Sequence, residues 1–195
     1  MLIAGLILAG GQGRRLGGAD KALLPLAGKP LLDHVLARLR PQLGALALSA
    51  NGDPARFAAW GLPVLPDAPL PPEAPAAGPL GGLLAGLGWA AGQGAEMLLS
   101  VPVDTPFVPD DLVARLWPAP ACAASAGRVH HLVGLWPVAP ARAALHAMLA
   151  RPGPRAVAGL GAALGCRAVA FAAPPDPFLN LNTPADLAAA AARGG

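Results

Sequence analysis

Three glycines and three cations near the start of the chain form a pattern suited to binding an anion. The glycines are Gly10, Gly11 and Gly13, and the cations are Arg14, Arg15 and Lys21, which fall within eight positions. Glycines that follow the first strand of an α/β sheet let backbone N–H groups approach a phosphate closely. The segment lacks both the Gly-x-Gly-x-x-Gly pattern and the Gly-Lys-Ser/Thr ending of the P-loop. The residues alone indicate either a polyphosphate site or a tight turn with surface arginines.

A second candidate is Asp104, which follows the apolar run Met97 to Val101 and precedes Thr105-Pro106. Ligands of open α/β sheets bind beyond the carboxyl ends of the strands, which is where this carboxylate lies. Mg²⁺ needs only one or two carboxylates, because it keeps several waters and also takes phosphate oxygens as ligands. The alternative role for Asp104 is to cap its own turn, and the residues by themselves do not separate the two.

Other kinds of catalytic chemistry have little support in the sequence. None of the three serines lies in a Gly-x-Ser-x-Gly context, and the two glutamates, Glu73 and Glu96, are far apart. His130 and His131 are adjacent, so on a strand they would point to opposite faces and not share a metal. What remains is positioning and charge neutralisation, as in phosphoryl and nucleotidyl transfer.

The elements that would carry these residues alternate between strands and helices. Apolar runs of strand length occur at Leu2 to Leu8, Ala45 to Ser49, Pro63 to Leu65, Met97 to Val101, Leu132 to Trp136 and Arg167 to Phe171. Helical patterns occur between Pro30 and Pro41, from Asp53 to Trp60, Leu80 to Leu87, Pro109 to Leu116, Arg142 to Leu149 and Ala156 to Leu164, and after a capping box at Thr183 to Asp186. This order predicts an α/β fold: a single domain over residues 1–195, in three layers, with a mostly parallel sheet between helices on both faces.

Composition excludes several classes of protein. Of the 195 residues 54% are hydrophobic and 13% charged, which excludes a disordered chain. The net charge of +3 and the lack of long basic runs argue against nucleic-acid binding. The first apolar run lacks the basic residues of a signal peptide, and the uncharged run Ala74 to Ala95 has too many Gly and Pro residues for a membrane span. Cys122 and Cys166 are too isolated to indicate a metal site or a disulfide framework. We therefore expect a cytoplasmic protein.

Five ordered segments carry a resemblance to a known family. They are Leu8-Ala9-Gly10-Gly11-x-Gly13-x-Arg15-Leu16-Gly17-Gly18-x-Asp20-Lys21, Ser49-Ala50-Asn51, Gly78-Pro79-Leu80-Gly81-Gly82, Pro102-Val103-Asp104-Thr105-Pro106-Phe107 and Asn180-Leu181-Asn182-Thr183-Pro184. Together they resemble the molybdenum cofactor guanylyltransferases, MobA-like nucleotidyltransferases with a Rossmann-like fold. The related sugar-phosphate nucleotidyltransferases usually place Pro where this chain has Asp20, and the cytidylyltransferases read Leu-Ala-Ala-Gly at the first turn.

The resemblance implies transfer of GMP from Mg²⁺-bound GTP to the terminal phosphate of molybdopterin, with release of pyrophosphate. The N-terminal part would bind GTP and the C-terminal part molybdopterin. Catalytic roles would fall to Arg15, Lys21 and Asp104, with Asp104 also the Mg²⁺ ligand. Ligand contacts would come from Leu8, Ala9, Gly10, Gly11, Gly13, Lys21, Asn51, Asp67, Gly78 and Asp104, and on the molybdopterin side from Asn180 and Asn182. Asp67 or Asn51 would read guanine, whose N1 and N2 groups are donors.

The resemblance also implies partners, and two competing functions stay open. Proteins of cofactor synthesis and acceptor molybdoenzymes are the expected partners, and neither nucleic acid nor membrane is expected. The competitors are a transferase of the same fold that uses CTP or a sugar phosphate, and a nucleotide-binding regulator without catalysis. Val103 and the segment His130-His131-Leu132 depart from the family pattern, and residues 117–129 and 150–166 match it weakly.

Overall fold

The computed structural model describes residues 1–10, 12–13, 19–70, 78–151, 156–172 and 174–192. A seven-stranded sheet forms its centre, in the order β11-β9-β10-β8-β1-β6-β7. The strands are β1 (Ile3–Leu8), β6 (Ala45–Ser49), β7 (Val64–Leu65), β8 (Met97–Pro102), β9 (Ala121–Ser125), β10 (Arg128–Pro137) and β11 (Arg167–Ala170). Only β10 is antiparallel to its neighbours in this sheet, and the other pairings are parallel. The predicted mostly parallel sheet is confirmed.

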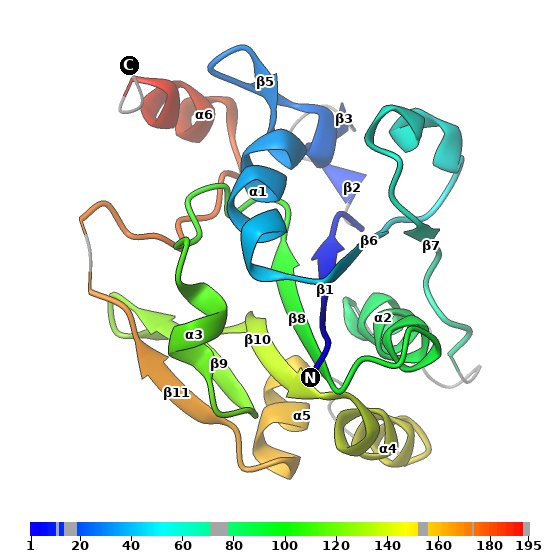
Figure 1. Cartoon of the computed structure of the whole chain (residues 1–195). Coiled ribbons are helices and arrows are strands. Elements are labelled where there is room, and N and C mark those ends of the chain that lie inside the picture. Colours follow the sequence, from blue (N-terminus) through cyan, green and yellow to red (C-terminus); the bar gives the residue numbers. More distant parts are fainter. Residues whose placement is uncertain (11, 14–18, 71–77, 152–155, 173, 193–195) are drawn as a thin grey trace.

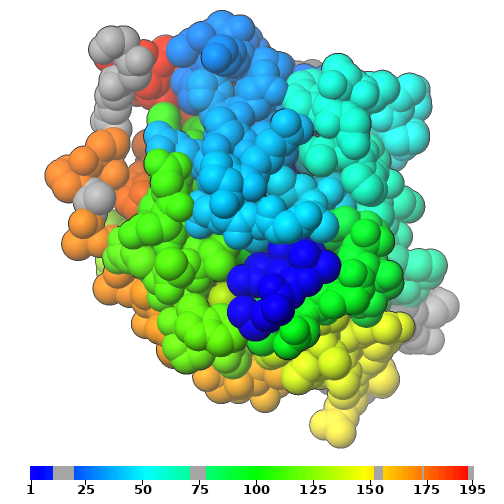
Figure 2. All heavy atoms as spheres, viewed as in Figure 1, coloured from blue at the N-terminus to red at the C-terminus, as the bar shows by residue number. Residues whose placement is uncertain are grey.

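Helices cover both faces of the sheet, because successive side chains of a strand point to opposite sides. Ile7 of β1 belongs to the core with α1 (Leu31–Leu39) and α3 (Leu112–Leu116). Leu6 belongs to the core on the other side, with α2 (Leu80–Gly92), α4 (Val138–Leu149) and α5 (Val157–Ala163) (Figure 1). In the space-filling view, α1 and the segment around α3 cover the strands on the near face (Figure 2). The molecule is a single three-layer α/β domain.

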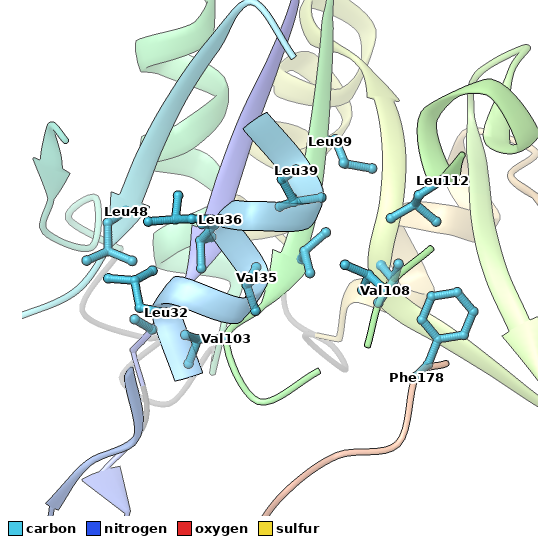
Figure 3. Close-up of a cluster of buried hydrophobic side chains, with 14 of the residues drawn as sticks. Leu32, Val35, Leu36, Leu39, Leu48, Leu99, Val103, Val108, Leu112 and Phe178 are labelled. Carbon is cyan, nitrogen blue, oxygen red and sulfur yellow. The ribbon is translucent and has the colours of Figure 1, made fainter. Parts of the chain in front are cut away.

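Helix α1 shows how the sequence builds one of these layers. Leu32, Val35, Leu36 and Leu39 recur at helical spacing, and none is more than 4% exposed. Figure 3 shows them in one cluster with side chains of the sheet. Complete burial of such a side chain contributes about 1.5–3 kcal/mol. The helix ends at Leu39, close to the predicted stop at Pro41.

The main differences from the sequence prediction lie at β9 and β10. The sequence pattern predicts no strand at 121–125 and begins the next strand at Leu132, but β10 begins at Arg128 and forms a hairpin with β9. The two turn residues, Ala126 and Gly127, have φ values of 47° and 74°. A turn with two left-handed residues joins adjacent antiparallel strands. This hairpin explains why β10 runs against the rest of the sheet.

Several short elements connect the larger ones and complete the fold. They are β2 (Gln12–Gly13), β3 (Ala19–Asp20), β4 (Pro25–Leu26), β5 (Lys29–Pro30), the 3₁₀ turns η2 (Lys21–Leu23), η3 (Arg40–Gln42) and η4 (Pro54–Trp60), and the last helix α6 (Pro184–Ala191). Asp53 caps η4, as predicted, by accepting a hydrogen bond of 2.9 Å from the Ala55 N–H. Leu26, Leu31, Leu181 and Ala190 form a small core beneath α6. Within the described ranges, every helix is too short or too polar to cross a membrane.

Candidate active site at the carboxyl edge of the sheet

The carboxyl ends of β1, β6 and β8 meet at one edge, because the three strands are parallel neighbours. The backbone pairing continues past the strand ends: the Ala9 N–H donates to the Ser49 carbonyl at 2.9 Å, and the Val103 N–H donates to the Leu8 carbonyl at 3.0 Å. The segments that leave this edge begin at Gly10, Asn51 and Asp104. Residues from three of the five sequence motifs are therefore adjacent in space.

Lys21, Asp104, Asn180 and Asn182 form one cluster of side chains at this edge. The Lys21 ammonium donates to Asp104 Oδ2 at 2.9 Å and also to Asn182 Oδ1. The Asn180 amide donates to Asp104 Oδ1 at 3.0 Å. The side chains of Lys21 and Asp104 are 19% and 13% exposed, so the ion pair is partly shielded from solvent. A cation and a carboxylate are thus held together just beyond the carboxyl end of β8.

The backbone around the second asparagine is fixed by the start of α6. Asp186 Oδ2 accepts from the N–H groups of Asn182 at 2.9 Å and Thr183 at 2.8 Å, and Thr183 Oγ1 accepts from the Asp186 N–H at 3.1 Å. The predicted capping box is therefore confirmed. The hydrogen bond from the Asn182 N–H, followed by those from Thr183, lowers the pKa of Asp186 below its usual value. The cap holds Asn182 in place for its contact with Lys21.

Asn51 and Asp67 form a second, exposed pair beyond the ends of β6 and β7. The Asn51 amide donates to Asp67 Oδ2 at 2.8 Å, and the Asp67 N–H donates to Asn51 Oδ1 at 2.9 Å. The first turn of α2 packs closely against this pair, since a Cβ at Gly81 would lie 3.0 Å from Asp67 Cβ. At Gly82 a Cβ would lie 2.3 Å from Ser49 Oγ. The two glycines therefore allow the helix to approach the edge.

The other predicted glycines and arginines are placed less fully. Gly11, Arg14 and Arg15 lie outside the described residues, and Gly13 pairs with Ala19 in the small β2–β3 sheet. A Cβ at Gly10 would meet no atom within 4 Å, so no packing contact with the described residues requires glycine there. Gly78 has a φ of 53°, a left-handed conformation that favours glycine, just before α2. Leu8 and Ala9 are buried and present their backbone at the edge.

Comparison with known proteins shows the family of this chain. A model of the MobA-like NTP transferase domain matches residues 5–168. The molybdenum cofactor guanylyltransferase of Acidiphilium cryptum is 61% identical over 187 residues, which cover 96% of this chain and 93% of that protein. This chain belongs to the molybdenum cofactor guanylyltransferase family. It is therefore a nucleotidyltransferase, as the sequence motifs predict.

Solved structures of similar fold support the architecture of this guanylyltransferase family member. Molybdopterin-guanine dinucleotide biosynthesis protein A from Archaeoglobus fulgidus gives a TM-score of 0.72 at 19% identity, with 97% of each chain covered. A 2-C-methyl-D-erythritol 4-phosphate cytidylyltransferase from Thermus thermophilus gives a TM-score of 0.65 at 21% identity, covering 99% of this chain and 98% of that one. Since the same fold occurs in a protein named as a cytidylyltransferase, the fold alone does not choose the base.

Sequence reasoning missed Arg56, which this family member places between the two clusters. Its guanidinium Nε donates to Asp20 Oδ2 at 2.7 Å, and its Nη2 donates to the Asn51 carbonyl at 2.6 Å. In the sequence, Asp20 stands out only as a difference from the related sugar-phosphate transferases, which usually have Pro at that position. The available signal was the Asp53-Pro54 cap, because a predicted helix start there puts Arg56 in the first turn, beside the Asn51 loop.

Other titratable groups lie outside these clusters. The free thiols of Cys122 and Cys166 are 3.1 Å apart, although 44 positions separate them, because β9 and β11 are neighbours. Their mutual hydrogen bond lowers the pKa of Cys166 and raises that of Cys122. Burial lowers the pKa of His130, whose Nε2 lies 2.7 Å from Ser125 Oγ. Among the described residues, no three His, Cys, Asp or Glu side chains are grouped to hold a metal ion.

Proposed function

We propose that this chain transfers GMP from GTP to the terminal phosphate of molybdopterin. The observation that carries the proposal is the Lys21–Asp104 ion pair at the carboxyl edge, beside the exposed Asn51–Asp67 pair. In this reaction a phosphate oxygen of molybdopterin attacks the α-phosphorus of GTP, the bond from that phosphorus to the α,β-bridging oxygen breaks, and pyrophosphate leaves. The attacking oxygen is already anionic near pH 7, so the step needs no general base.

The main task of the protein is then to bring two anions together. Lys21 would bind the phosphates of GTP through its ammonium, and the backbone N–H groups of Gly10, Gly11 and Gly13 would approach the same phosphates. The sequence motif adds Arg15 to the cations that would bind these phosphates. Leu8, Ala9 and Gly78 would line the nucleotide with their backbone. Positive charge and N–H dipoles at this edge would offset the repulsion between the donor and acceptor phosphates.

Asp104 is the proposed ligand of a divalent metal ion, and we assign Mg²⁺. A carboxylate offers about four lone-pair sites, and Lys21 and Asn180 each use one hydrogen-bonding direction of Asp104. A single carboxylate fits Mg²⁺, which completes its shell with waters and phosphate oxygens. Bound Mg²⁺ would neutralise charge on the phosphates of GTP. The Lys21 ammonium, now paired with Asp104, would remain close to those phosphates.

Different parts of the chain would bind the guanine base and molybdopterin. Asn51 occupies Oδ2 of Asp67, which leaves Oδ1 to accept hydrogen bonds from guanine N1 and N2. Asn180 and Asn182, on the C-terminal side of Asp104, would contact molybdopterin. The remaining proposals rest on family membership: a cytoplasmic enzyme that meets proteins of cofactor synthesis and acceptor molybdoenzymes.

The test is pyrophosphate release with molybdopterin and each of GTP, CTP, UTP and ATP in the presence of Mg²⁺. We expect release with GTP, and an Asp104→Asn variant should lose about 100-fold in rate. Asp110→Asn is the matched control, because Asp110 also forms an ion pair, with Arg38 at 2.6 Å, but its side chain is 71% exposed. Preference for CTP or UTP would favour the cytidylyltransferase-like alternative. GTP binding without pyrophosphate release would favour a regulator.

A further inference from the structure

Arg56 makes polar contacts with two separate segments of the candidate site. It donates to Asp20 Oδ2 at 2.7 Å, to the Asn51 carbonyl at 2.6 Å and to the Asp53 carbonyl. Its guanidinium carbon lies 4.5 Å from the centre of the Phe57 ring, and Phe57 is 1% exposed. The planar fork is therefore held by a buried ring on one side and by three acceptors around its edge.

One arm of this contact set leads to the phosphate-binding lysine. Asp20 uses Oδ2 for Arg56, and its Oδ1 accepts from the Ala22 N–H at 3.1 Å, which caps η2. Lys21 is the first residue of that turn, and its ammonium extends to Asp104. A fixed Asp20 carboxylate therefore fixes the backbone from which Lys21 projects.

The other arm leads to the proposed base-reading pair. Arg56 holds the carbonyl of Asn51, while the side chain of Asn51 exchanges two hydrogen bonds with Asp67. The loop between Asn51 and Asp53 is exposed, and Gly52 within it has a φ of 85°. An exposed turn that contains a left-handed glycine has few packing contacts of its own. The hydrogen bonds from the Arg56 guanidinium therefore do much to fix its conformation.

We propose that Arg56 is a positioning residue that fixes Lys21 relative to the Asn51–Asp67 pair before GTP binds. The inference rests on the proposed function, in which these groups read the phosphates and the base of one nucleotide. A ligand that spans two sites binds more tightly when their separation is already correct, because it need not order them itself. Loss of Arg56 should therefore weaken GTP binding. Turnover at saturating GTP should change little, since the bound nucleotide then holds both groups.

The experiment measures the Kd for GTP by titration, and kcat and KM by pyrophosphate release, in wild type and five variants of the full chain. For Arg56→Ala we expect Kd and KM to rise about tenfold, with kcat within about threefold of wild type. Arg56→Lys should give an intermediate Kd, since one ammonium cannot contact both Asp20 and the Asn51 carbonyl as the guanidinium does. Asp20→Asn retains an oxygen for the Ala22 cap but weakens the charged contact, so combining it with Arg56→Ala should add little to the single loss.

Arg115→Ala is the matched control. Arg115 also stacks on a ring, 3.7 Å from the centre of Phe171, and donates to a carbonyl, that of Ala170, at 2.8 Å. Arg115 contacts neither Asp20 nor the Asn51 loop, so the Kd of the Arg115→Ala variant for GTP should stay within about twofold of wild type. Equal Kd values for the Arg56→Ala and Arg115→Ala variants would overturn the inference, as would a loss confined to kcat. Failure of the wild-type chain to bind GTP would instead overturn the proposed function itself.

Discussion

Replacing Gly82 by alanine tests whether α2 is packed directly against the candidate site. A Cβ at this position would lie 2.3 Å from Ser49 Oγ, 3.2 Å from Asp67 Oδ1 and 3.3 Å from Leu8 Cδ2. Either the Ser49 hydroxyl or the helix has to move. Overpacking of a filled site costs about 1–3 kcal/mol, and the helix preference of alanine over glycine offsets up to about 1 kcal/mol. We expect a net loss of about 1–2 kcal/mol in the free energy of unfolding.

Gly88 in the same helix provides the matched control. A Cβ there would meet no described atom within 4 Å, so Gly88→Ala adds the same methyl group without a clash. It should raise the free energy of unfolding by up to about 1 kcal/mol. In thermal unfolding, Gly82→Ala should lower Tm by roughly 2–8 °C, and Gly88→Ala should raise it slightly. The two variants should therefore move in opposite directions.

A second substitution identifies the clash itself. Ser49 is 1% exposed, and its hydroxyl has no hydrogen-bond partner among the described residues, so Ser49→Ala should cost little or stabilise the protein. Combined with Gly82→Ala it should recover part of the lost stability, since the shortest contact is gone. Displacement of Asp67 in Gly82→Ala should also weaken GTP binding in a titration. A Gly82→Ala variant as stable as wild type, or one unaffected by Ser49→Ala, would refute the packing argument.

Two further predictions concern the cluster around Lys21. Lys21→Arg should lower pyrophosphate release about tenfold or more, because a planar fork cannot replace a compact ammonium between Asp104 and Asn182; full activity in the release assay would contradict this. Because hydrogen bonds from the backbone lower the pKa of Asp186, its ionised form stabilises the fold above the unfolded pKa of about 4, and this contribution is lost as the pH falls through the lower folded value. Denaturant unfolding should give a difference in the free energy of unfolding between wild type and Asp186→Asn that is constant near neutral pH and disappears below about pH 4. A difference that stays the same at every pH would exclude the effect.

The sequence predicts those parts of the fold whose side chains are themselves apolar and periodic. The runs that form β1, β6 and β8 are apolar except for Ser49 and Ser100, and the leucines of α1 recur at helical spacing. Strand β9 has the sequence Ala-Cys-Ala-Ala-Ser, without the β-branched or aromatic residues that favour strands. It is a strand because β10 and β11 pair with it on either side. Its turn has Ala126 where Asn or Asp would be the usual hairpin signal.

The sequence predicts individual residues of the candidate site, but not the contacts between them. The position of Asp104 follows from the rule that ligands bind at the carboxyl ends of parallel strands. The contact of Lys21 with Asn182 spans 161 positions, and no periodic pattern links residues that far apart. Arg56 carries no motif at all, and its role depends on the direction of a side chain in a short 3₁₀ turn. Spacing along the chain therefore predicts the proposed ligand-binding groups more readily than the residues that position them.

Charged residues are scarce in this chain, and the adjacent residues Asp20 and Lys21 each form an ion pair. Only 13% of the residues are charged, yet of the three ion pairs within the described ranges, two involve this dipeptide: Asp20 with Arg56 and Lys21 with Asp104. Asp20 caps the 3₁₀ turn that begins at Lys21, so the side chain of Asp20 contacts Arg56 near the loop after β6, and that of Lys21 contacts Asp104 beyond the end of β8. In the proposed function, a substitution at either residue is therefore expected to weaken contacts with both the phosphates and the base of GTP. That coupling is what the Asp20 and Arg56 variants measure.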